Sequence, residues 1–426
     1  MKFRSFRSAV VAGAALLLTV SACGSDDAGS GGTGDAQKLT VWIMQGTNPD
    51  ATAFFDSVKA DFQKENPGTT LDVQFQPWGE AHDKFTTAIA GGTTPDVAEV
   101  GTTWTPEFAA AGALEDLTDR VGTGKDNLVQ GLVDAGTVDG KLYGMPWYAG
   151  VRSFVYNKDM FTKAGVKPPT TWAEIEQVAT KIKASQPDVI PFAVAGECTY
   201  CAMPFVWGAG GEVATDTGGT WTAAIDSEKA QKGLDFYTGL ATKGFSTPAA
   251  QTWKETDLLK NFESGKTAMV ITGNWTLTKI ATDAPALKDK IGAFPIPGET
   301  GGIAPSFLGG SHLGMFKTAK NKDLAYKFIQ LMTSDKYAAQ WAQQANYFPG
   351  SKTALDAATK TDDPAVAPFA KQMIDGGKSM PVTPAWGKVE GAKTLTKLIQ
   401  SVVTGKATVA DATKTAATEM NALFKG

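Results

Sequence analysis

Histidine and cysteine are scarce in this sequence. Its 426 residues include only two histidines, His82 and His312, and three cysteines. Neither histidine has a second ligand at metal-binding spacing, so the sequence predicts no metal site. Basic residues are not in excess either: 40 Lys and Arg stand against 44 Asp and Glu, for a net charge of -4. This balance lacks the positive surface that nucleic acid requires, so we expect no nucleic-acid partner.

Sequence signatures of catalysis and of cofactor binding are also missing. We find no G-x-S-x-G nucleophile turn, no phosphate-binding P-loop and no dinucleotide fingerprint. A glycosidase needs two carboxylates flanking the scissile bond. Glu80, Glu99 and Glu197 could reach a cleft, but no pair among them stands out. The sequence therefore predicts no enzyme and no cofactor, and a secreted glycosidase is the enzymatic alternative.

Long apolar runs are absent except near the N-terminus. Ala9–Val20 is an apolar stretch preceded by Lys2, Arg4 and Arg7. It is shorter than the roughly 20 residues that a membrane-spanning helix needs. A short apolar core behind a cationic start is typical of a secretory signal peptide. The sequence therefore predicts export across the cytoplasmic membrane.

The apolar run ends in Val20-Ser21-Ala22-Cys23, which resembles the lipobox of bacterial lipoproteins. That resemblance implies a lipoprotein signal peptide over residues 1–22 and a fatty-acyl (palmitate-type) membrane anchor on Cys23. Residues 24–35 are nearly all Gly, Ser, Asp, Thr and Ala, which cannot bury a core. We therefore expect residues 23–37 to be a flexible tether. The protein is predicted to stand on the extracellular face of the cytoplasmic membrane.

Strand and helix patterns alternate from residue 39 onward. Residues 39–44, 71–75 and 95–100 read as strands. A helix is predicted to start at Asn48-Pro49-Asp50, with Asn as cap and Pro at the first helical position, and a second helix covers residues 80–90. The order β-α-β-α-β indicates an α/β fold with a parallel sheet covered by helices.

Polar and aromatic side chains follow each of these strands. Gln45 comes after the first strand, Trp78 after the second, and Thr102, Thr103 and Trp104 after the third. Ligands of open α/β sheets bind outside the carboxyl ends of the strands, so we expect these residues to contact a ligand. Four other aromatic residues lie on strands or helical faces and are predicted to pack in cores: Trp42, Phe154, Trp172 and Trp341.

Several further segments share the pattern of one protein family. They are residues 95–97, 108–118, 143–146, 155–161, 168–172 (PPTTW), 262–275 (FESGKTAMVITGNW) and 323–331 (DLAYKFIQL). With these motifs the chain resembles the family 1 extracellular solute-binding proteins, the maltose-binding-protein-like group. The resemblance runs in order over residues 38–426.

The resemblance implies an α/β fold of the two-lobed periplasmic-binding-protein kind (type II), with a ligand cleft between lobes that close about a hinge. The implied parts are lobe 1 over 38–149, lobe 2 over 150–307, a return to lobe 1 over 308–347, and C-terminal helices over 348–426 that pack on lobe 2. The chain would cross between lobes near residues 148–151 and 308–311. It would act as a monomer that delivers its ligand to the permease subunits of an ABC importer.

The family resemblance also implies ligand-contacting positions. Gly273-Asn274-Trp275 matches the family's sugar-stacking tryptophan, while Tyr200 and Trp386 match two further aromatics. Glycines at a cleft let backbone N–H groups approach a ligand. The remaining candidates are Trp147, Tyr148, Arg152, Glu197, Gly309, Gly310, Ser311 and His312.

The chemistry of these positions favours a carbohydrate, a di- or oligosaccharide, because most are aromatic or uncharged. Two departures argue against assuming maltose. Thr103 and Trp104 stand where the maltose binder has a charged pair, and Cys198, with Glu197 beside it, stands where that protein has a glutamate. Amino acids or peptides, polyamines and chelated iron are the alternative ligands.

The last two cysteines form the motif Cys198-Thr199-Tyr200-Cys201. In the cytosol a C-x-x-C pair suggests redox chemistry or half of a metal site. In an exported protein a structural disulfide is the stronger expectation, because that compartment is oxidising. We predict a disulfide bond beside the cleft wall, near Tyr200.

Overall fold

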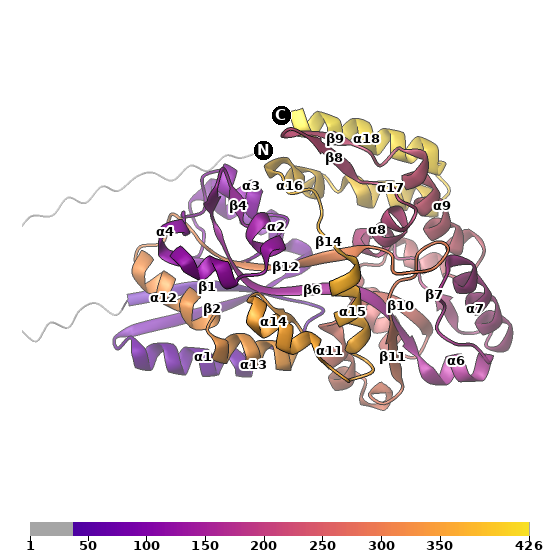
Figure 1. The fold of residues 1–426 in the computed structure, drawn as a ribbon, viewed down its shortest axis with the longest axis horizontal. Coiled ribbons are helices and arrows are strands. Elements are labelled where there is room, and N and C mark those ends of the chain that lie inside the picture. Colours follow the sequence, from indigo (N-terminus) through magenta and orange to yellow (C-terminus); the bar gives the residue numbers. More distant parts are fainter. Residues whose placement is uncertain (1–36, 426) are drawn as a thin grey trace, which may run out of the picture.

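The structure is a computed structural model that describes residues 37–425. It shows an α/β protein with two lobes joined by a ten-stranded sheet, whose main strand order is β2-β1-β3-β12-β6-β10-β7 (Figure 1). The predicted signal peptide, the acylation site Cys23 and the tether up to residue 36 lie outside the described residues. Gln37, predicted to be the last tether residue, begins β1. Within the described range no helix is both long and apolar enough to cross a membrane.

The first lobe is built on parallel strands. Val41 of β1 lies opposite Val73 of β2 and Val97 of β3, and both pairings are parallel. The elements of this lobe are β1 (Gln37–Gln45), α1 (Thr52–Glu65), β2 (Thr69–Pro77), α2 (Trp78–Gly91), β3 (Val97–Gly101), α3 (Thr105–Ala110), α4 (Thr118–Val121), η1 (Gly122–Asn127), α5 (Gln130–Ala135), β4 (Thr137–Val138), β5 (Lys141–Leu142), α12 (Lys322–Met332) and α13 (Asp335–Ala345).

Alternate residues of β1 point to opposite faces of this sheet. Val41 and Ile43 pack with Phe54 of α1 in one buried cluster. Trp42 packs with Phe85 of α2 in another, with ring centroids 5.3 Å apart. Strands of a parallel sheet are apolar on both sides when helices cover both faces. The predicted β-α-β-α-β arrangement is confirmed.

The first helix begins later than its sequence predicted. α1 starts at Thr52 rather than at Pro49. Asp50 accounts for the difference, because its Oδ1 accepts hydrogen bonds from the backbone N–H and the hydroxyl of Thr52, at 2.9 and 2.7 Å. The Asn48 carboxamide instead donates to the Met44 carbonyl at 3.4 Å. The second helix also differs, since Trp78, expected on a loop, is the first residue of α2.

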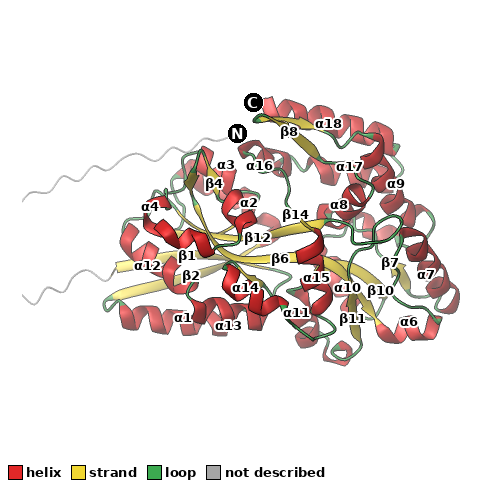
Figure 2. Ribbon diagram, viewed as in Figure 1, coloured by secondary structure: helices red, strands yellow, loops and turns green. Residues whose placement is uncertain are grey.

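Two strands run through both lobes. The first half of β6 (Gly144–Asn157) pairs with β12 (Ser306–Met315), Ala149 lying opposite Gly310. The second half of β6 pairs with β10 in the second lobe, Phe154 lying opposite Ile271. The residues predicted as lobe crossings therefore lie inside continuous β-structure, which Figure 2 shows as yellow ribbons through the middle of the molecule.

The second lobe packs helices around the far ends of these strands. Phe154, Trp172 and Phe205 belong to its large apolar cluster. Its elements are α6 (Lys158–Ala164), α7 (Trp172–Ser185), β7 (Ile190–Phe192), α8 (Thr199–Gly208), β8 (Ala214–Thr217), β9 (Thr220–Ala223), α9 (Glu228–Thr242), η2 (Pro248–Thr252), α10 (Glu255–Glu263), β10 (Thr267–Gly273), α11 (Thr276–Asp283), η3 (Pro285–Leu287) and β11 (Ile291–Phe294).

The C-terminal segment reaches both lobes. Helices α17 (Thr394–Val403) and α18 (Val409–Lys425) pack on α9. Helix α16 (Pro384–Gly391) also lies against α3 of the first lobe. Four elements precede α16 in this segment: β13 (Phe348–Pro349), which pairs with β6, then α14 (Lys352–Thr359), α15 (Ala367–Gly376) and β14 (Gly377–Lys378).

The four aromatic residues predicted to be core are buried. Trp42, Phe154, Trp172 and Trp341 expose 7%, 0%, 5% and 3% of their surfaces. Trp341 stacks on Trp147 at 5.6 Å between ring centroids. These predictions are confirmed, because strand and helical periodicity identify buried faces directly.

Candidate ligand-binding site

A cavity of about 550 Å³ lies between the lobes. Its lining comes from the ends of β1 and β3, from the middle of β6, from α2, α8, α10, α16 and α17, and from the crossing strand β12. Most of the predicted ligand-binding residues are among those that line it: Gln45, Trp78, Thr102, Thr103, Trp104, Tyr148, Arg152, Glu197, Tyr200, Trp275, Gly309, Gly310, Ser311 and Trp386.

Three predicted residues do not line the cavity. Trp147 is 1% exposed and packs in the first-lobe core. Asn274 is fully buried, and its Oδ1 accepts the Val151 backbone N–H at 3.0 Å. Trp147 points away from the cavity while its neighbour Tyr148 lines it, because side chains alternate across a strand. Asn274 lies in the turn after β10, where its side chain hydrogen-bonds to backbone instead. Both assignments are corrected to structural roles.

His312 is the third corrected residue, and it is wholly buried. Its Nε2 lies 2.9 Å from the Leu132 carbonyl and its Nδ1 lies 2.8 Å from the Thr105 hydroxyl. A carbonyl can only accept, so Nε2 donates and Nδ1 accepts from Thr105. Burial lowers the pKa of His312 to about 4, which keeps the ring neutral. The residue ties β12 to the first lobe and offers nothing to a ligand.

The first-lobe wall consists of two indoles. Trp78 opens α2 and Trp104 precedes α3, with ring centroids 5.5 Å apart. Gly101 lies beneath them, and a Cβ there would sit 3.5 Å from Trp104 and 3.6 Å from Trp78. Both rings therefore pack at van der Waals distance over the end of β3. The pair presents half-buried apolar faces to the cavity.

Trp275 forms the opposite wall. Its Nε1 donates to the Thr47 hydroxyl at 2.9 Å, which links a second-lobe ring to the first lobe. The ring lies on glycine backbone: a Cβ on Gly150 or on Gly273 would come within 2.5 or 2.2 Å of it. Tyr347 stacks on it with centroids 5.4 Å apart. These contacts fix the indole, which is 9% exposed.

Arg152 lies between the aromatic rings. Its guanidinium carbon is 4.9 Å from the ring centroid of Tyr200, 5.1 Å from that of Trp275 and 5.7 Å from that of Phe307. Such cation–π contacts strengthen when the cation is desolvated. Its NH2 group donates to Glu255 Oε2 at 2.7 Å. The charge of Arg152 is therefore already neutralised by a neighbour in the same cavity.

Two atoms of that ion pair have unused hydrogen-bonding capacity. Within residues 37–425, Arg152 Nε and Glu255 Oε1 are buried without a partner. A buried polar group without a partner costs free energy, and such groups in a cavity are commonly satisfied by ligand or water. One atom is a donor and the other an acceptor. Together they suit a neutral group that both accepts and donates, such as a pair of sugar hydroxyls.

The floor of the cavity rests on a buried carboxylate. Glu99 on β3 is 1% exposed and accepts hydrogen bonds from the Met44 backbone N–H at 2.8 Å, from the Ser311 hydroxyl at 2.7 Å and from the Tyr148 hydroxyl. Burial raises the pKa of Glu99 to about 7, against the lowering effect of these donors. Glu99 thus holds Tyr148 and Ser311, which line the cavity, from behind.

The Glu99→Gln variant should gain stability relative to the wild type as the pH rises from about 4.5 to about 7. The folded wild type keeps the Glu99 proton up to a pKa of about 7, whereas the unfolded chain loses it near 4.5. Folding of the wild type therefore becomes less favourable across this window, and glutamine does not titrate. Denaturant unfolding of both proteins measures the effect, with a slope of up to about 1.4 kcal/mol per pH unit.

The quantity to follow is the difference in unfolding free energy between the wild type and Glu99→Gln. His312 titrates in the opposite sense, because its pKa of about 4 lies below its ordinary value of 6.5, and this removes stability as the pH falls. Both proteins contain His312, so subtracting their unfolding free energies removes its contribution. Curves that stay parallel between pH 4.5 and 7 would show that Glu99 does not titrate there.

Glu390 on α16 is the main cavity residue that the sequence did not indicate. Its Oε2 accepts from the Thr103 hydroxyl and from Trp104 Nε1, both at 2.8 Å, and its Oε1 accepts from the Tyr200 hydroxyl. Burial raises the pKa of Glu390, and these donors oppose the rise. Its position four residues after Trp386, on the same helical face, was the available signal.

Other missed lining residues are Thr47, Glu255, Phe307 and Tyr347. Tyr347 stacks on Tyr148 with ring centroids 3.9 Å apart, and Phe307 stacks on Tyr200 at 4.1 Å. Glu255 and Tyr347 reach the cavity from segments distant from the predicted strand ends, whereas Thr47 lies only two residues after the predicted Gln45.

The C-x-x-C cysteines are joined in the structure. Cys198 and Cys201 form a disulfide with Cα atoms 5.3 Å apart at the start of α8. Cys198 lines the cavity next to Tyr200. Both cysteines are buried, at 3% and 1% exposure. Among residues 37–425 no group of three His, Cys, Asp or Glu side chains could hold a metal ion.

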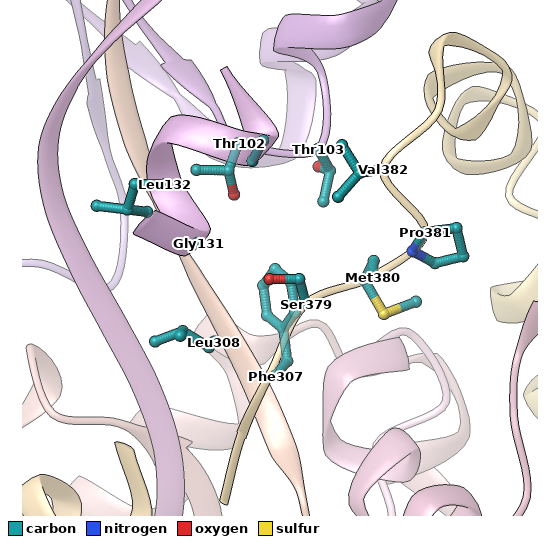
Figure 3. Close-up of a pocket in the computed structure, with 11 residues that line it drawn as sticks. Thr102, Thr103, Gly131, Leu132, Phe307, Leu308, Ser379, Met380, Pro381 and Val382 are labelled. Carbon is teal, nitrogen blue, oxygen red and sulfur yellow. The ribbon is translucent and has the colours of Figure 1, made fainter. Parts of the chain in front are cut away.

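A second, much smaller cavity adjoins the site. It measures about 10 Å³ and shares Thr102, Thr103 and Phe307 with the large cavity. Figure 3 shows the two threonines at one end of it and the 379–382 segment along one side. A volume of this size holds about one water molecule, so it cannot take a sugar ring.

Comparison with known proteins identifies the family. The family profile described as bacterial extracellular solute-binding protein matches residues 46–339, more than half of the chain. The protein belongs to this family, which agrees with its two lobes and interlobe cavity. The resemblance predicted from the motifs is therefore confirmed.

Three individual proteins are similar to this chain over most of its length. The chain is 32% identical to the diacetylchitobiose binding protein DasA of Streptomyces coelicolor over 96% of both chains. An ABC transporter solute-binding protein of Thermotoga lettingae, solved with alpha-D-tagatose, is 28% identical, with a TM-score of 0.83 over 91% of this chain and 100% of that one. A maltose-bound MalE3 of T. maritima is 25% identical, with a TM-score of 0.79 over 91% and 100% of the two chains.

Proposed function

We propose that this protein captures a neutral oligosaccharide between its lobes and delivers it to the permease of an ABC importer. The observation that carries the proposal is the cavity between the indoles of Trp104 and Trp275, with the Arg152–Glu255 pair beside them. Flat aromatic faces suit the C–H faces of sugar rings, and fixed polar groups suit their hydroxyls. Sugar-binding relatives such as DasA support the same assignment.

The dimensions of the cavity also support an oligosaccharide. A volume of about 550 Å³ lies within the range of sites that enclose small molecules. Residues from both lobes line it, so a ligand that contacts Trp104 and Trp275 together favours the closed arrangement. We propose that closure bends the chain at the crossings near 148–151 and 308–311, between lobe 1 (38–149, 308–347) and lobe 2 (150–307).

The charged groups beside the aromatic walls argue against the alternative ligands. An amino acid needs a cation for its carboxylate, but Arg152 is paired with Glu255 at 2.7 Å. Polyamines need carboxylates, but Glu255 and Glu390 already accept hydrogen bonds from Arg152 and from Thr103, Trp104 and Tyr200. Charged residues of both signs lie elsewhere in the lining, namely Glu80, Asp83, Lys254 and Lys393. Binding without catalysis is the family's role, so labelled oligosaccharides should be returned uncut after incubation.

A thermal-shift panel tests the proposed ligand class. The mature protein is heated with di- and trisaccharides, with spermidine and with amino acids as separate arms. A bound sugar should raise the melting temperature in a concentration-dependent way, because it stabilises only the folded state. A shift produced by spermidine or by an amino acid, with none from any sugar, would overturn the proposal.

The Cys23→Ala variant should leave the membrane fraction. The basis is the lipobox-like Val20–Cys23, which lies outside the described residues. Without the thiol no acyl chain can be attached, and the affinity for the bilayer that acyl chains provide is lost. Cell fractionation with immunoblotting measures the distribution, with a variant of the nearby Ser25 as control. A Cys23→Ala protein that stays in the membrane pellet would refute the lipid anchor.

The proposed partner is the permease of an importer, and the binding protein acts as a monomer. The family is an extracellular one, consistent with ligand capture outside the cytoplasmic membrane. Size-exclusion chromatography with light scattering, with and without sugar, tests the oligomeric state. A mass near that of one mature chain is expected in both cases.

A further inference from the structure

One carboxylate joins the two lobes across the cavity. Glu390 is the penultimate residue of α16. On the first-lobe side it accepts hydrogen bonds from Thr103 and Trp104, both at 2.8 Å. On the second-lobe side it accepts one from Tyr200 of α8. The same side chain therefore holds one aromatic residue of each cavity wall by its polar end.

The helix that carries Glu390 is closely packed against the first lobe. A Cβ on Gly387 would lie 1.8 Å from Glu107 Oε2, and a Cβ on Gly391 would lie 3.1 Å from the His82 ring. His82 and Glu107 form an ion pair at 2.7 Å. Trp386 and Val389 of the same helix belong to the second-lobe core. Helix α16 thus lies at the boundary between the lobes, where Figure 1 labels it between α3 and α17.

We propose that Glu390 is a positioning residue for ligand binding, which stabilises the closed lobes and orients Trp104 and Tyr200 as the facing cavity walls. This inference rests on the proposed function. In this proposal α16 couples closure of the two lobes to the orientation of the aromatic side chains that line the cavity. Glu390 acts through its two aromatic partners and not through the ligand.

The hydrogen-bond inventory explains why a carboxylate is needed. An ionised glutamate accepts on both oxygens, and here Oε2 serves the first lobe while Oε1 serves the second. A glutamine of the same shape accepts on one oxygen only and presents a donor in place of the other. With its oxygen toward Thr103 and Trp104, its NH2 group can donate to the Tyr200 hydroxyl oxygen, but every bond between the lobes is then neutral and weaker than the charge-assisted one.

The position of Glu390 between the lobes also predicts how its replacement changes the affinity for the ligand. Bonds between the lobes exist only while the lobes are together, so their loss lowers the fraction of protein in the binding-competent state. The apparent dissociation constant rises in inverse proportion to that fraction, whatever the ligand. A residue that contacts the ligand directly would instead affect different sugars by different factors.

The test compares Glu390→Gln with the wild type in two measurements. Small-angle X-ray scattering of the ligand-free proteins should show a more extended variant. Calorimetric titration should show an affinity loss of about tenfold, since charge-assisted hydrogen bonds are replaced by neutral ones, and the same factor should hold for each sugar that binds the wild type. Glu419→Gln, in a pair with Lys397 on the outer C-terminal helices, is the matched control and should change neither result.

A second variant guards against misfolding. Tyr200→Phe keeps the ring on Phe307 but removes the hydroxyl that donates to Glu390, so it should extend the ligand-free protein in the same direction. Identical scattering of wild type, Glu390→Gln and Tyr200→Phe would overturn the proposal, as would affinity losses for Glu390→Gln that differ between sugars. The scattering result needs no ligand, so it stands apart from a failure to find a binding sugar.

Discussion

Replacing Trp275 by alanine is expected to weaken sugar binding by roughly thirtyfold or more, the loss that follows from removing a buried aromatic anchor worth about 2 kcal/mol. The indole is 9% exposed, lines the cavity and is held by Thr47, Tyr347 and the backbone at Gly150 and Gly273. A ring held in this way stacks on a sugar without first losing conformational freedom. Calorimetric titration with the best sugar from the thermal-shift panel measures the loss.

The fold of the Trp275→Ala protein must be checked alongside its affinity. Trp275 also contacts the first-lobe core, so some loss of melting temperature is expected. Titration well below the melting temperature separates the two effects. Wild-type affinity in Trp275→Ala would mean that the sugar does not lie against this wall, and the proposed binding site would then be wrong.

Replacing Trp172 by alanine should have the opposite profile: a large loss of stability with little change in affinity. Trp172 opens α7, is 5% exposed and stacks on Phe236 with ring centroids 4.5 Å apart. Its Nε1 donates to the Pro297 carbonyl at 3.1 Å, and the residue does not line the cavity. Truncating a buried tryptophan costs about 3–5 kcal/mol of unfolding free energy. Denaturant titration measures this loss.

The two tryptophan variants serve as controls for each other. Each removes one indole of similar burial, and only one of the two indoles faces the cavity. If Trp172→Ala lost affinity as strongly as Trp275→Ala under conditions where both are folded, affinity would be reporting general stability. Distinct profiles would separate binding from packing.

The sequence was sufficient to predict the class of fold and much of the cavity. Apolar runs and period-two alternation identified the first strands, and helical spacing identified the first helices, because residues that face a core recur at the period of their element. The carboxyl ends of those strands then located Gln45, Thr103 and Trp104, all of which line the cavity. This reasoning succeeds because a parallel sheet brings all its strand ends to one edge.

The errors arose where neighbouring residues face in opposite directions. Trp147 and Tyr148 are adjacent on β6, yet only Tyr148 lines the cavity. Asn274 and Trp275 also face in different directions, although they lie in the turn between β10 and α11 rather than on a strand. A motif locates such a segment but does not determine which of its residues faces the cavity.

The missed residues had a different cause. Glu255 and Glu390 come from helices whose approach to the cavity depends on how the lobes pack, a long-range property that local periodicity does not contain. Glu390 meets Thr103 across 287 positions of sequence. Only the tertiary arrangement brings such pairs together.

β12, one of the two strands that run through both lobes, affects the order in which the chain can fold. β12 lies between β3 and β6, so Ser311 pairs with Gly101 on one side and with Tyr148 on the other. A growing chain that has emerged only as far as residue 305 therefore has a gap in the middle of its sheet. The N-terminal half cannot become a finished folding unit ahead of the rest, and such long-range pairing makes folding slow. The two halves of the sheet, β2-β1-β3 and β6-β10-β7, thus stay unjoined until β12 has been synthesised.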